Sequence, residues 1–181
     1  MNEGLIPRRY AKALYKVAVE RNCSDRIYSL MQQLAATFAS SEQLRALIAN
    51  PFVEAADKEA AVTAAAGAAA TDETFADFLK LLIQNRRMDL CASVANAYVD
   101  IFRKERNIRR VEVISAAPLD SAVEKRIKSV IEEHLHGATM EFSAKVDPAL
   151  IGGFIVTVDN ERLDASLRNR LKEIRLNLLN K

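Results

Sequence analysis

The periodicity of the sequence changes within residues 97–114, AYVDIFRKERNIRRVEVI. Before residue 106, apolar residues return every three to four positions, which is typical of one side of an α-helix. Beyond Arg109 the helical period gives way to the alternation of a β-strand, beginning with Val111, Val113 and Ile114. The change predicts a domain boundary, with residues 1–106 and 107–181 forming two small domains.

The first domain is expected to be a six-helix bundle. Glycine is almost absent from this half, alanine and leucine are abundant, and the helical period persists throughout. Ser40 and Gln43 have the spacing of a capping box, Thr71 is the expected cap of the fifth helix, and Gly67 weakens an alanine-rich fourth helix. The expected helices cover about 7–22, 25–39, 40–50, 54–70, 75–86 and 90–106.

The second domain is expected to be a small α+β unit, so the fold class is α+β overall. Residues 140–146 alternate between apolar and polar, as in a half-buried strand, and a second strand follows Gly153. Ser121 and Glu124 form a capping box for a helix that ends at Gly137. Asp164 is the expected cap of a last helix, whose inward stripe is Leu167, Leu171, Ile174 and Leu178.

Composition excludes several classes of protein. The 26 Lys and Arg residues against 24 Asp and Glu leave a net charge of +2, too little to imply a polyanionic partner. Two cysteines without CxxC spacing indicate a reducing compartment and structural thiols. Apolar runs are too short for a membrane span, and the start lacks a signal peptide's apolar core, so direct membrane insertion is not expected.

Catalytic and cofactor motifs are not found. The five glycines form no phosphate-binding loop, and the pair Gly152 and Gly153 precedes a strand, which favours a turn with positive φ. His134 and His136 stand beside two glutamates, yet their spacing on a helix turns them to different faces, so solvated polar residues are favoured over a metal site. We therefore predict no cofactor, no metal and no catalytic residues, and an enzyme would need an unrecognised substrate.

One basic segment suggests an alternative function. Residues 103–110 carry five cations next to Phe102, as in a small nucleic-acid-binding adaptor. Acidic residues are interspersed along the chain and the overall charge is small, so a solvated helix end at the domain hinge is the favoured interpretation, with no nucleic acid bound. The five cations are Arg103, Lys104, Arg106, Arg109 and Arg110.

Two helices of the first domain have unusually narrow polar faces. On the first helix only Lys12, Lys16 and Glu20 form a polar stripe, and the helix 75–86 is polar mainly at Asp77, Lys80 and Gln84. Two interpretations stay open. Either the helices leave an apolar groove for a partner's amphipathic helix, or both lie at the centre of the bundle.

Four segments resemble the delta (oligomycin-sensitivity-conferring protein) subunits of ATP synthase, bacterial type. The resemblance covers essentially the whole chain in the family's order and spacing, and the aspartate-proline and double-glycine segment is the most specific. Ala165 departs from the glycine usual in the family, which leaves the local turn geometry open. The segments are IPRRYAKALY (6–15), LLIQNRR (81–87), ISAAPL (114–119) and DPALIGGF (147–154).

The resemblance implies a non-catalytic stator subunit of an F-type ATP synthase, peripheral on the cytoplasmic face of the bacterial inner membrane. It would link alpha-subunit N-termini on the catalytic head to the C-termini of the b-subunit dimer, so that rotation couples proton transport to ATP synthesis. The implied head-binding groove lies between the first and fifth helices, for which we predict Tyr10, Ala11, Leu14, Ala18, Phe75, Phe78, Leu79 and Leu82. For the stalk we predict Arg168, Arg175, Leu176 and Leu179 on the last helix, with Arg170 adding charge.

Overall fold

The chain divides into two compact units, Met1–Arg103 (unit 1) and Lys104–Lys181 (unit 2). The computed structural model describes residues 4–69, 71–135, 137–159 and 161–179, with only the backbone described at 173, 174 and 177–179. The division falls three residues before the boundary expected from the sequence. Helices followed by a small sheet confirm the α+β fold class.

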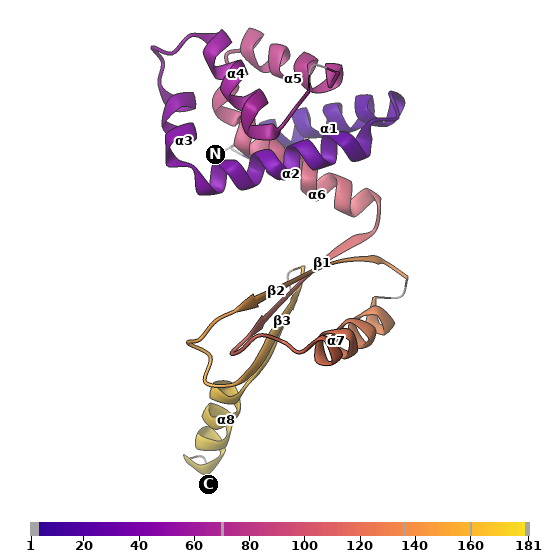
Figure 1. The fold of residues 1–181 in the computed structure, drawn as a ribbon, viewed down its shortest axis with the longest axis vertical. Coiled ribbons are helices and arrows are strands. Elements are labelled where there is room, and N and C mark those ends of the chain that lie inside the picture. The colour runs from indigo at the N-terminus through magenta and orange to yellow at the C-terminus, as the bar shows by residue number, and fades with distance from the viewer. Residues whose placement is uncertain (1–3, 70, 136, 160, 180–181) are drawn as a thin grey trace. The chain divides into compact units, whose positions relative to one another are not determined.

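The regular elements in the described residues of unit 1 are all helices (Figure 1). The helices follow the apolar period, and the ends agree with the sequence expectation to within a few residues. Asn50 and Pro51 do follow the last residue of α3, because proline disfavours helical geometry in the residue before it. The elements are α1 (Leu5–Glu20), α2 (Ser24–Ser40), α3 (Glu42–Ala49), α4 (Ala55–Ala66), α5 (Glu73–Gln84), the 3-10 helix η1 (Met88–Leu90) and α6 (Cys91–Glu105).

Three helix ends differ in detail from the sequence expectation. Ser41 rather than Ser40 caps α3, since its hydroxyl accepts a hydrogen bond from Leu44 N at 3.2 Å. Gly67 does not weaken α4 but ends it, because its φ of 64° is left-handed and breaks the helical hydrogen-bond pattern. Asp72 rather than Thr71 stands at the N-cap position of α5.

The core of unit 1 combines aliphatic side chains with an aromatic cluster. The rings of Tyr28 and Phe102 stack with centroids 4.2 Å apart, and Tyr98 is fully buried. The Tyr98 hydroxyl donates to Ser24 O at 3.2 Å, and burial raises the pKa of Tyr98. The alanine-rich α4 adds little to this core, with Val62 and Ala66 as its buried residues.

Unit 2 contains a four-stranded sheet in its described residues, with strand order β2-β1-β3-β4. The strands are β1 (Ile108–Ser115), β2 (Thr139–Val146), β3 (Gly153–Val158) and β4 (Glu161–Ser166), and the helices are α7 (Ser121–His134) and α8 (Leu167–Leu179). β1 runs parallel to β2, which requires the crossover through α7, and antiparallel to β3. Val113 therefore pairs with Ala144 on one side and Val156 on the other.

The start of the last helix differs from the sequence expectation. Residues 161–166 form β4, and Ser166 rather than Asp164 caps α8, since its hydroxyl accepts from Asn169 N at 3.3 Å. Gly153 has a φ of 82°, and a Cβ there would lie 2.4 Å from Ala165 O. Only glycine fits this backbone approach, in agreement with the turn predicted at Gly153.

The main hydrophobic cluster of unit 2 lies on one face of the sheet. Val111, Val113 and Val156 are buried there, and Ile127 and Ile131 of α7 pack against them. The side chains of alternate residues turn to the other face. That face is polar in part, for Lys145 Nζ lies 2.6 Å from the Glu112 carboxylate and lowers the pKa of Glu112.

Candidate functional site

Seven of the eight side chains predicted for the head-binding groove lie in the core of unit 1. They are at most 6% exposed, covered by the bundle's own side chains, whereas Tyr10 is half-buried. Of the two interpretations left open by the sequence, the one that places both helices at the centre of the bundle fits these seven positions. That any of them contacts a partner stays a prediction. The seven are Ala11, Leu14, Ala18, Phe75, Phe78, Leu79 and Leu82.

The helices α1 and α5 are linked at both ends by arginines. Arg21, directly after α1, donates to Thr74 Oγ1 at 3.2 Å and lies 3.1 Å from Asp77 Oδ2. Arg87, shortly after α5, donates to the Tyr10 hydroxyl at 3.5 Å, with its guanidinium carbon 5.8 Å from the ring centroid. The end of α1 thus meets the start of α5 and vice versa, so the two helices run antiparallel with a seam between them.

Exposed apolar residues lie along this seam. Val17 is seven residues from Tyr10 on α1, and Leu81 is four residues from Asp77 on α5, so each shares a helix face with a seam residue. Their exposed fractions are 37% for Val17 and 44% for Leu81. Leu81 and Val17 were not predicted as surface residues, because apolar residues surround both helices and the helical period alone does not show which of them are exposed.

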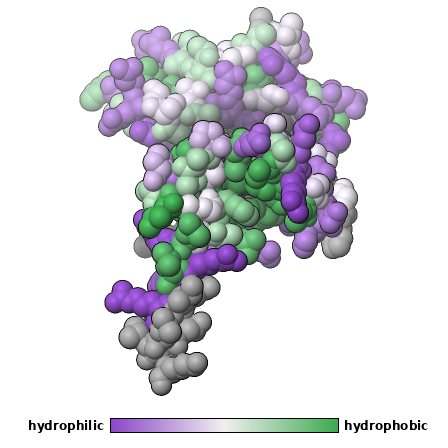
Figure 2. All heavy atoms as spheres, turned by 60° about the horizontal axis from the view of Figure 1, so that its bottom comes forward, coloured by the Kyte–Doolittle hydropathy of each residue, from purple (hydrophilic) through white to green (hydrophobic). Residues whose placement is uncertain are grey.

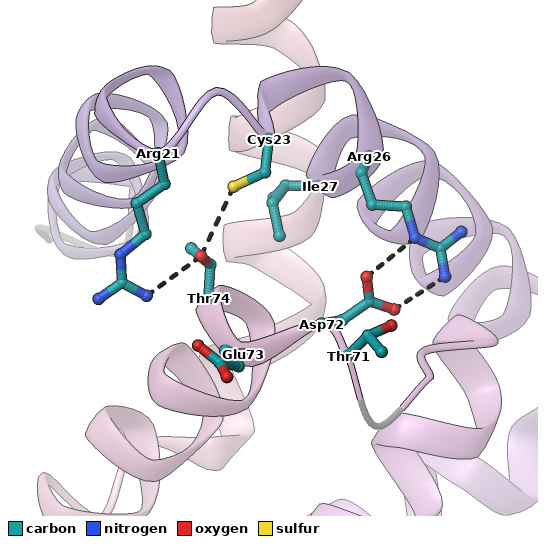
Figure 3. Close-up of a pocket in the computed structure, with 8 residues that line it drawn as sticks. All are labelled: Arg21, Cys23, Arg26, Ile27, Thr71, Asp72, Glu73 and Thr74. Atoms are coloured by element: carbon teal, nitrogen blue, oxygen red, sulfur yellow. Dashed lines mark hydrogen bonds and ion pairs between the residues drawn. The ribbon is translucent and has the colours of Figure 1, made fainter.

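The start of α5 is also fixed to α2 (Figure 3). The Arg26 guanidinium binds the Asp72 carboxylate through two hydrogen bonds of 3.0 and 2.8 Å, and Ala69 N donates to the same carboxylate at 2.8 Å. The Asp72 side chain is 8% exposed, and its hydrogen bond to Arg26 lowers its pKa. These bonds hold the loop before α5 against α2.

A cavity of about 250 Å³ lies beside Arg21 and Arg26. It is lined by these two arginines, by Cys23 and Ile27, and by residues 71–74 at the start of α5. Cys23 Sγ donates to Thr74 Oγ1 at 3.5 Å across it. Arg21 and Arg26 both line the cavity, but each already faces a carboxylate of this chain. The arrangement therefore ties helices together and provides no uncompensated positive charge for an anion.

The stripe of α8 that was predicted to face inward is exposed in unit 2. Leu167 and Leu171 are 46% and 59% exposed, so that prediction is wrong for both. In the described residues, hydrogen bonds to the rest of unit 2 hold only the first turn of α8, so they do not bring its apolar stripe against the sheet. Leu167 N donates to Gly152 O at 2.9 Å, and Arg168 Nη2 donates to Ala149 O at 3.0 Å.

The predicted stalk residues lie on the same helix. Arg168, Arg175 and Leu176 are exposed, with Leu176 at 48%, whereas the side chain of Leu179 lies outside the described residues, as do those of Ile174 and Leu178. Figure 2 shows hydrophobic residues gathered over unit 2 where α8 begins. The large apolar residues that are exposed in the described part of unit 2 are Val123, Val130, Val146, Ile151, Leu163, Leu167, Leu171 and Leu176.

Part of the basic segment 103–110 is engaged within each unit. Arg103 Nε donates to the Tyr28 hydroxyl at 3.1 Å, and Arg109 Nη1 lies 2.8 Å from Asp159 Oδ2.

The histidines considered as metal ligands stand at the end of α7. His134 Nδ1 lies 2.9 Å from Val130 O, whereas His136 lies outside the described residues. Within the part of the chain that the structure describes, no cluster of three His, Cys, Asp or Glu side chains is placed to hold a metal ion.

None of the helices in the described ranges has the length and apolar content to cross a bilayer. The family model of the ATP synthase delta (OSCP) subunit matches residues 6–178. The chain belongs to this family. The resemblance found in the four sequence segments is thereby confirmed.

Relatives and a solved structure agree with this assignment. The ATP synthase subunit delta of Parabacteroides distasonis is 36% identical over 179 residues, covering 99% of this chain and 98% of that one. The subunit of the same name from Caulobacter vibrioides is 34% identical over 171 residues, covering 94% and 92%. A chain of the Toxoplasma gondii mitochondrial ATP synthase hexamer has the same fold, with a TM-score of 0.72 at 22% identity, covering 96% of this chain and 97% of that one.

Family membership decides between the functions considered from the sequence. A delta (OSCP) subunit is a non-catalytic stator component of ATP synthase, which confirms that this chain is not an enzyme. Nothing in the comparisons supports the nucleic-acid-binding adaptor, and Arg103 and Arg109 are engaged within their own units. The surfaces that matter are therefore those that hold other subunits.

Proposed function

We propose that this stator subunit ties the N-terminal segments of alpha subunits to the C-terminal ends of the b-subunit dimer, on the cytoplasmic face of a bacterial inner membrane. Unit 1 holds the head and unit 2 holds the stalk. The division of the chain into two compact units, each with its own exposed apolar residues, supports two separate binding surfaces.

The head-binding surface is the seam between α1 and α5. The observation that carries this proposal is that Val17 and Leu81 are exposed along a seam tied at both ends by Arg21 and Arg87. The apolar side of an amphipathic helix fits such a strip, because knobs from a third helix pack between two antiparallel ones. The buried residues predicted from the sequence, such as Leu14, pack in the core beneath this seam and hold α1 and α5 in place.

The stalk-binding surface is the exposed side of α8 together with neighbouring apolar residues. Leu167 and Leu171 are four residues apart on one side of α8 and are both exposed, and contiguous exposed apolar side chains mark interaction surfaces in soluble proteins. Arg168 and Arg175 lie on the same helix and orient an acidic partner segment. A helix of the b dimer that covers α8 would give this stripe the burial that unit 2 does not.

Holding both partners at once suits a stator. A catalytic head does useful work only if it does not turn with the rotor, so slow dissociation matters more than fast association. When one surface is bound, the second binding event becomes intramolecular, and this raises the effective concentration of the partner. Two moderate interfaces on one chain therefore give a durable link.

One experiment on the full chain tests both surfaces. Titration calorimetry would measure binding of a synthetic alpha N-terminal peptide and of a dimeric b C-terminal fragment to the Leu81→Asp and Leu171→Asp variants. We expect each variant to lose about tenfold or more in affinity for its own partner only, because a charge at the centre of an apolar contact is costly.

Matched variants control for folding. Leu5→Asp and Val123→Asp place the same charge at other exposed apolar positions, of 56% and 46% exposure, and should leave both affinities unchanged. Unaltered binding of the alpha peptide by Leu81→Asp would overturn the seam as the head-binding surface. Unaltered binding of the b fragment by Leu171→Asp would do the same for α8.

A further inference from the structure

The two ends of the seam are built alike. Arg21 adjoins Asn22, whose φ is 53°, and Arg87 adjoins Arg86, whose φ is 54°. In each case the chain leaves a helix through a left-handed residue, and the neighbouring arginine reaches across to the opposite helix. Non-glycine residues adopt this conformation at some cost, so both turns are held by their surroundings.

We infer that Arg21 and Arg87 are positioning residues that set the spacing of α1 and α5, and thereby shape the seam for the alpha segment. This inference rests on the proposed function of the seam. The arginines act through the helices that they join and not by touching the partner.

The contacts of Arg21 favour positioning over direct recognition. Its guanidinium faces Asp77 of this chain, so its charge is already compensated, and the same nitrogen donates to Thr74. Thr74 is 7% exposed, whereas the side chains of Arg21 and Asp77 are 49% and 56% exposed. The tie therefore runs from the surface into the buried first turn of α5, where Cys23 also donates to Thr74.

The tie at the other end uses a ring. Arg87 meets both the hydroxyl and the face of Tyr10, which is itself half-buried between surface and core. Between the two ties, Val17 and Leu81 depend on the distance between α1 and α5 to present one continuous strip.

Exposed ion pairs contribute little to global stability, so losing a tie should leave unit 1 folded. The effect should appear in binding instead, because affinity falls with the fraction of molecules whose seam is correctly formed. This separation of stability from binding distinguishes a positioning residue from an ordinary structural one.

A charge exchange in the full chain tests the inference. We expect Arg21→Asp and Asp77→Arg each to weaken binding of the alpha peptide about three- to fivefold, and the double variant to recover to within about twofold of the natural chain. If Arg21 instead binds an acidic group of the peptide, the double variant will stay as weak as Arg21→Asp, and the inference is overturned.

A second readout needs no partner. Amide hydrogen exchange in the first turns of α5 should speed up in both single variants and slow again in the double variant, while exchange in α6 stays constant. If the natural chain fails to bind the alpha peptide, the proposed function fails, yet this arm still reports on the tie. Unchanged exchange at α5 in the single variants would overturn the tie itself.

Three further variants complete the design. Tyr10→Phe keeps the ring but removes the hydroxyl, and should weaken binding less than Arg87→Gln, which removes both contacts. Arg45→Gln is the matched control, because Arg45 of α3 donates to Phe38 O at 3.1 Å within the bundle. It should leave peptide binding unchanged. Equal losses in Arg45→Gln and Arg87→Gln would show a general loosening of the bundle and overturn the positioning role.

Discussion

Helices α5 and α8 carry apolar stripes of similar pattern but have opposite surroundings. The apolar residues of α5 that were expected to meet a partner, such as Phe78 and Leu79, are 4% and 0% exposed. Those of α8 that were expected to face inward, Leu167 and Leu171, are 46% and 59% exposed. An apolar stripe thus shows that a helix side requires cover, but not whether its own unit provides it.

The difference follows from the neighbours of each helix. α5 packs against α1, α4 and η1, so it has cover on several sides. α8 contacts β4, the edge strand of the sheet, and α7 occupies the face that holds the buried valines. A short sheet with one helical layer has no second layer to bury another helix.

The largest expected effect concerns the buried apolar residues of α5. Leu79→Ala should lower the unfolding free energy of unit 1 by about 3 kcal/mol, because a fully buried leucine leaves a cavity when it is shortened. Urea unfolding followed by tyrosine fluorescence measures it cleanly, since the four tyrosines, Tyr10, Tyr15, Tyr28 and Tyr98, all belong to unit 1. A loss below about 1 kcal/mol would contradict the burial of Leu79.

A smaller effect concerns the bond that places α5. Asp72→Asn should lower the unfolding free energy by about 1 to 2 kcal/mol at neutral pH, because it removes the charge that accepts two hydrogen bonds from Arg26. The same tyrosine signal reports it. Asp100→Asn, at an exposed position of α6, is the matched control and should change stability by less than about 0.5 kcal/mol.

The pH dependence of this effect has a definite sign. The pKa of Asp72 is lowered in the folded chain, so its contribution is present above the unfolded pKa of about 4 and disappears as the pH falls through the lower folded value. Asp72→Asn and the natural chain should therefore differ in stability at neutral pH and converge in strong acid. A difference that grew on acidification would contradict the assignment.

The smallest expected effect concerns the exposed apolar residues of α8. Leu171→Ala should change the unfolding free energy of unit 2 by less than about 0.5 kcal/mol, because its side chain is already 59% exposed. Amide hydrogen exchange in β1 and β3 reports on unit 2, which has no tyrosine. Destabilisation of about 2 kcal/mol would mean that unit 2 covers Leu171 itself.

Local features of the fold were largely predictable. Pro51 ends α3 as expected, and the alternation in residues 140–146 is that of β2. The strand β4 was missed, because Asp164 next to an apolar stripe is also the pattern of a helix N-terminus. Its pairing with β3 depends on the short turn at Asp159, with φ of 50°, and on the close approach of Gly153 to Ala165 at the other end of the hairpin, which the helical pattern after Asp164 does not indicate.

The sequence by itself determined the two-part α+β organisation, the family and the identity of the helices that carry excess apolar surface, because periodicity and local motifs are properties of neighbouring residues. Only the tertiary structure decided that Leu79 is core and Leu81 is surface, that Leu171 is uncovered, and that Arg21 and Arg87 join α1 to α5. Burial depends on which distant segments pack around a residue, and a helical period specifies a direction but not the neighbour found there.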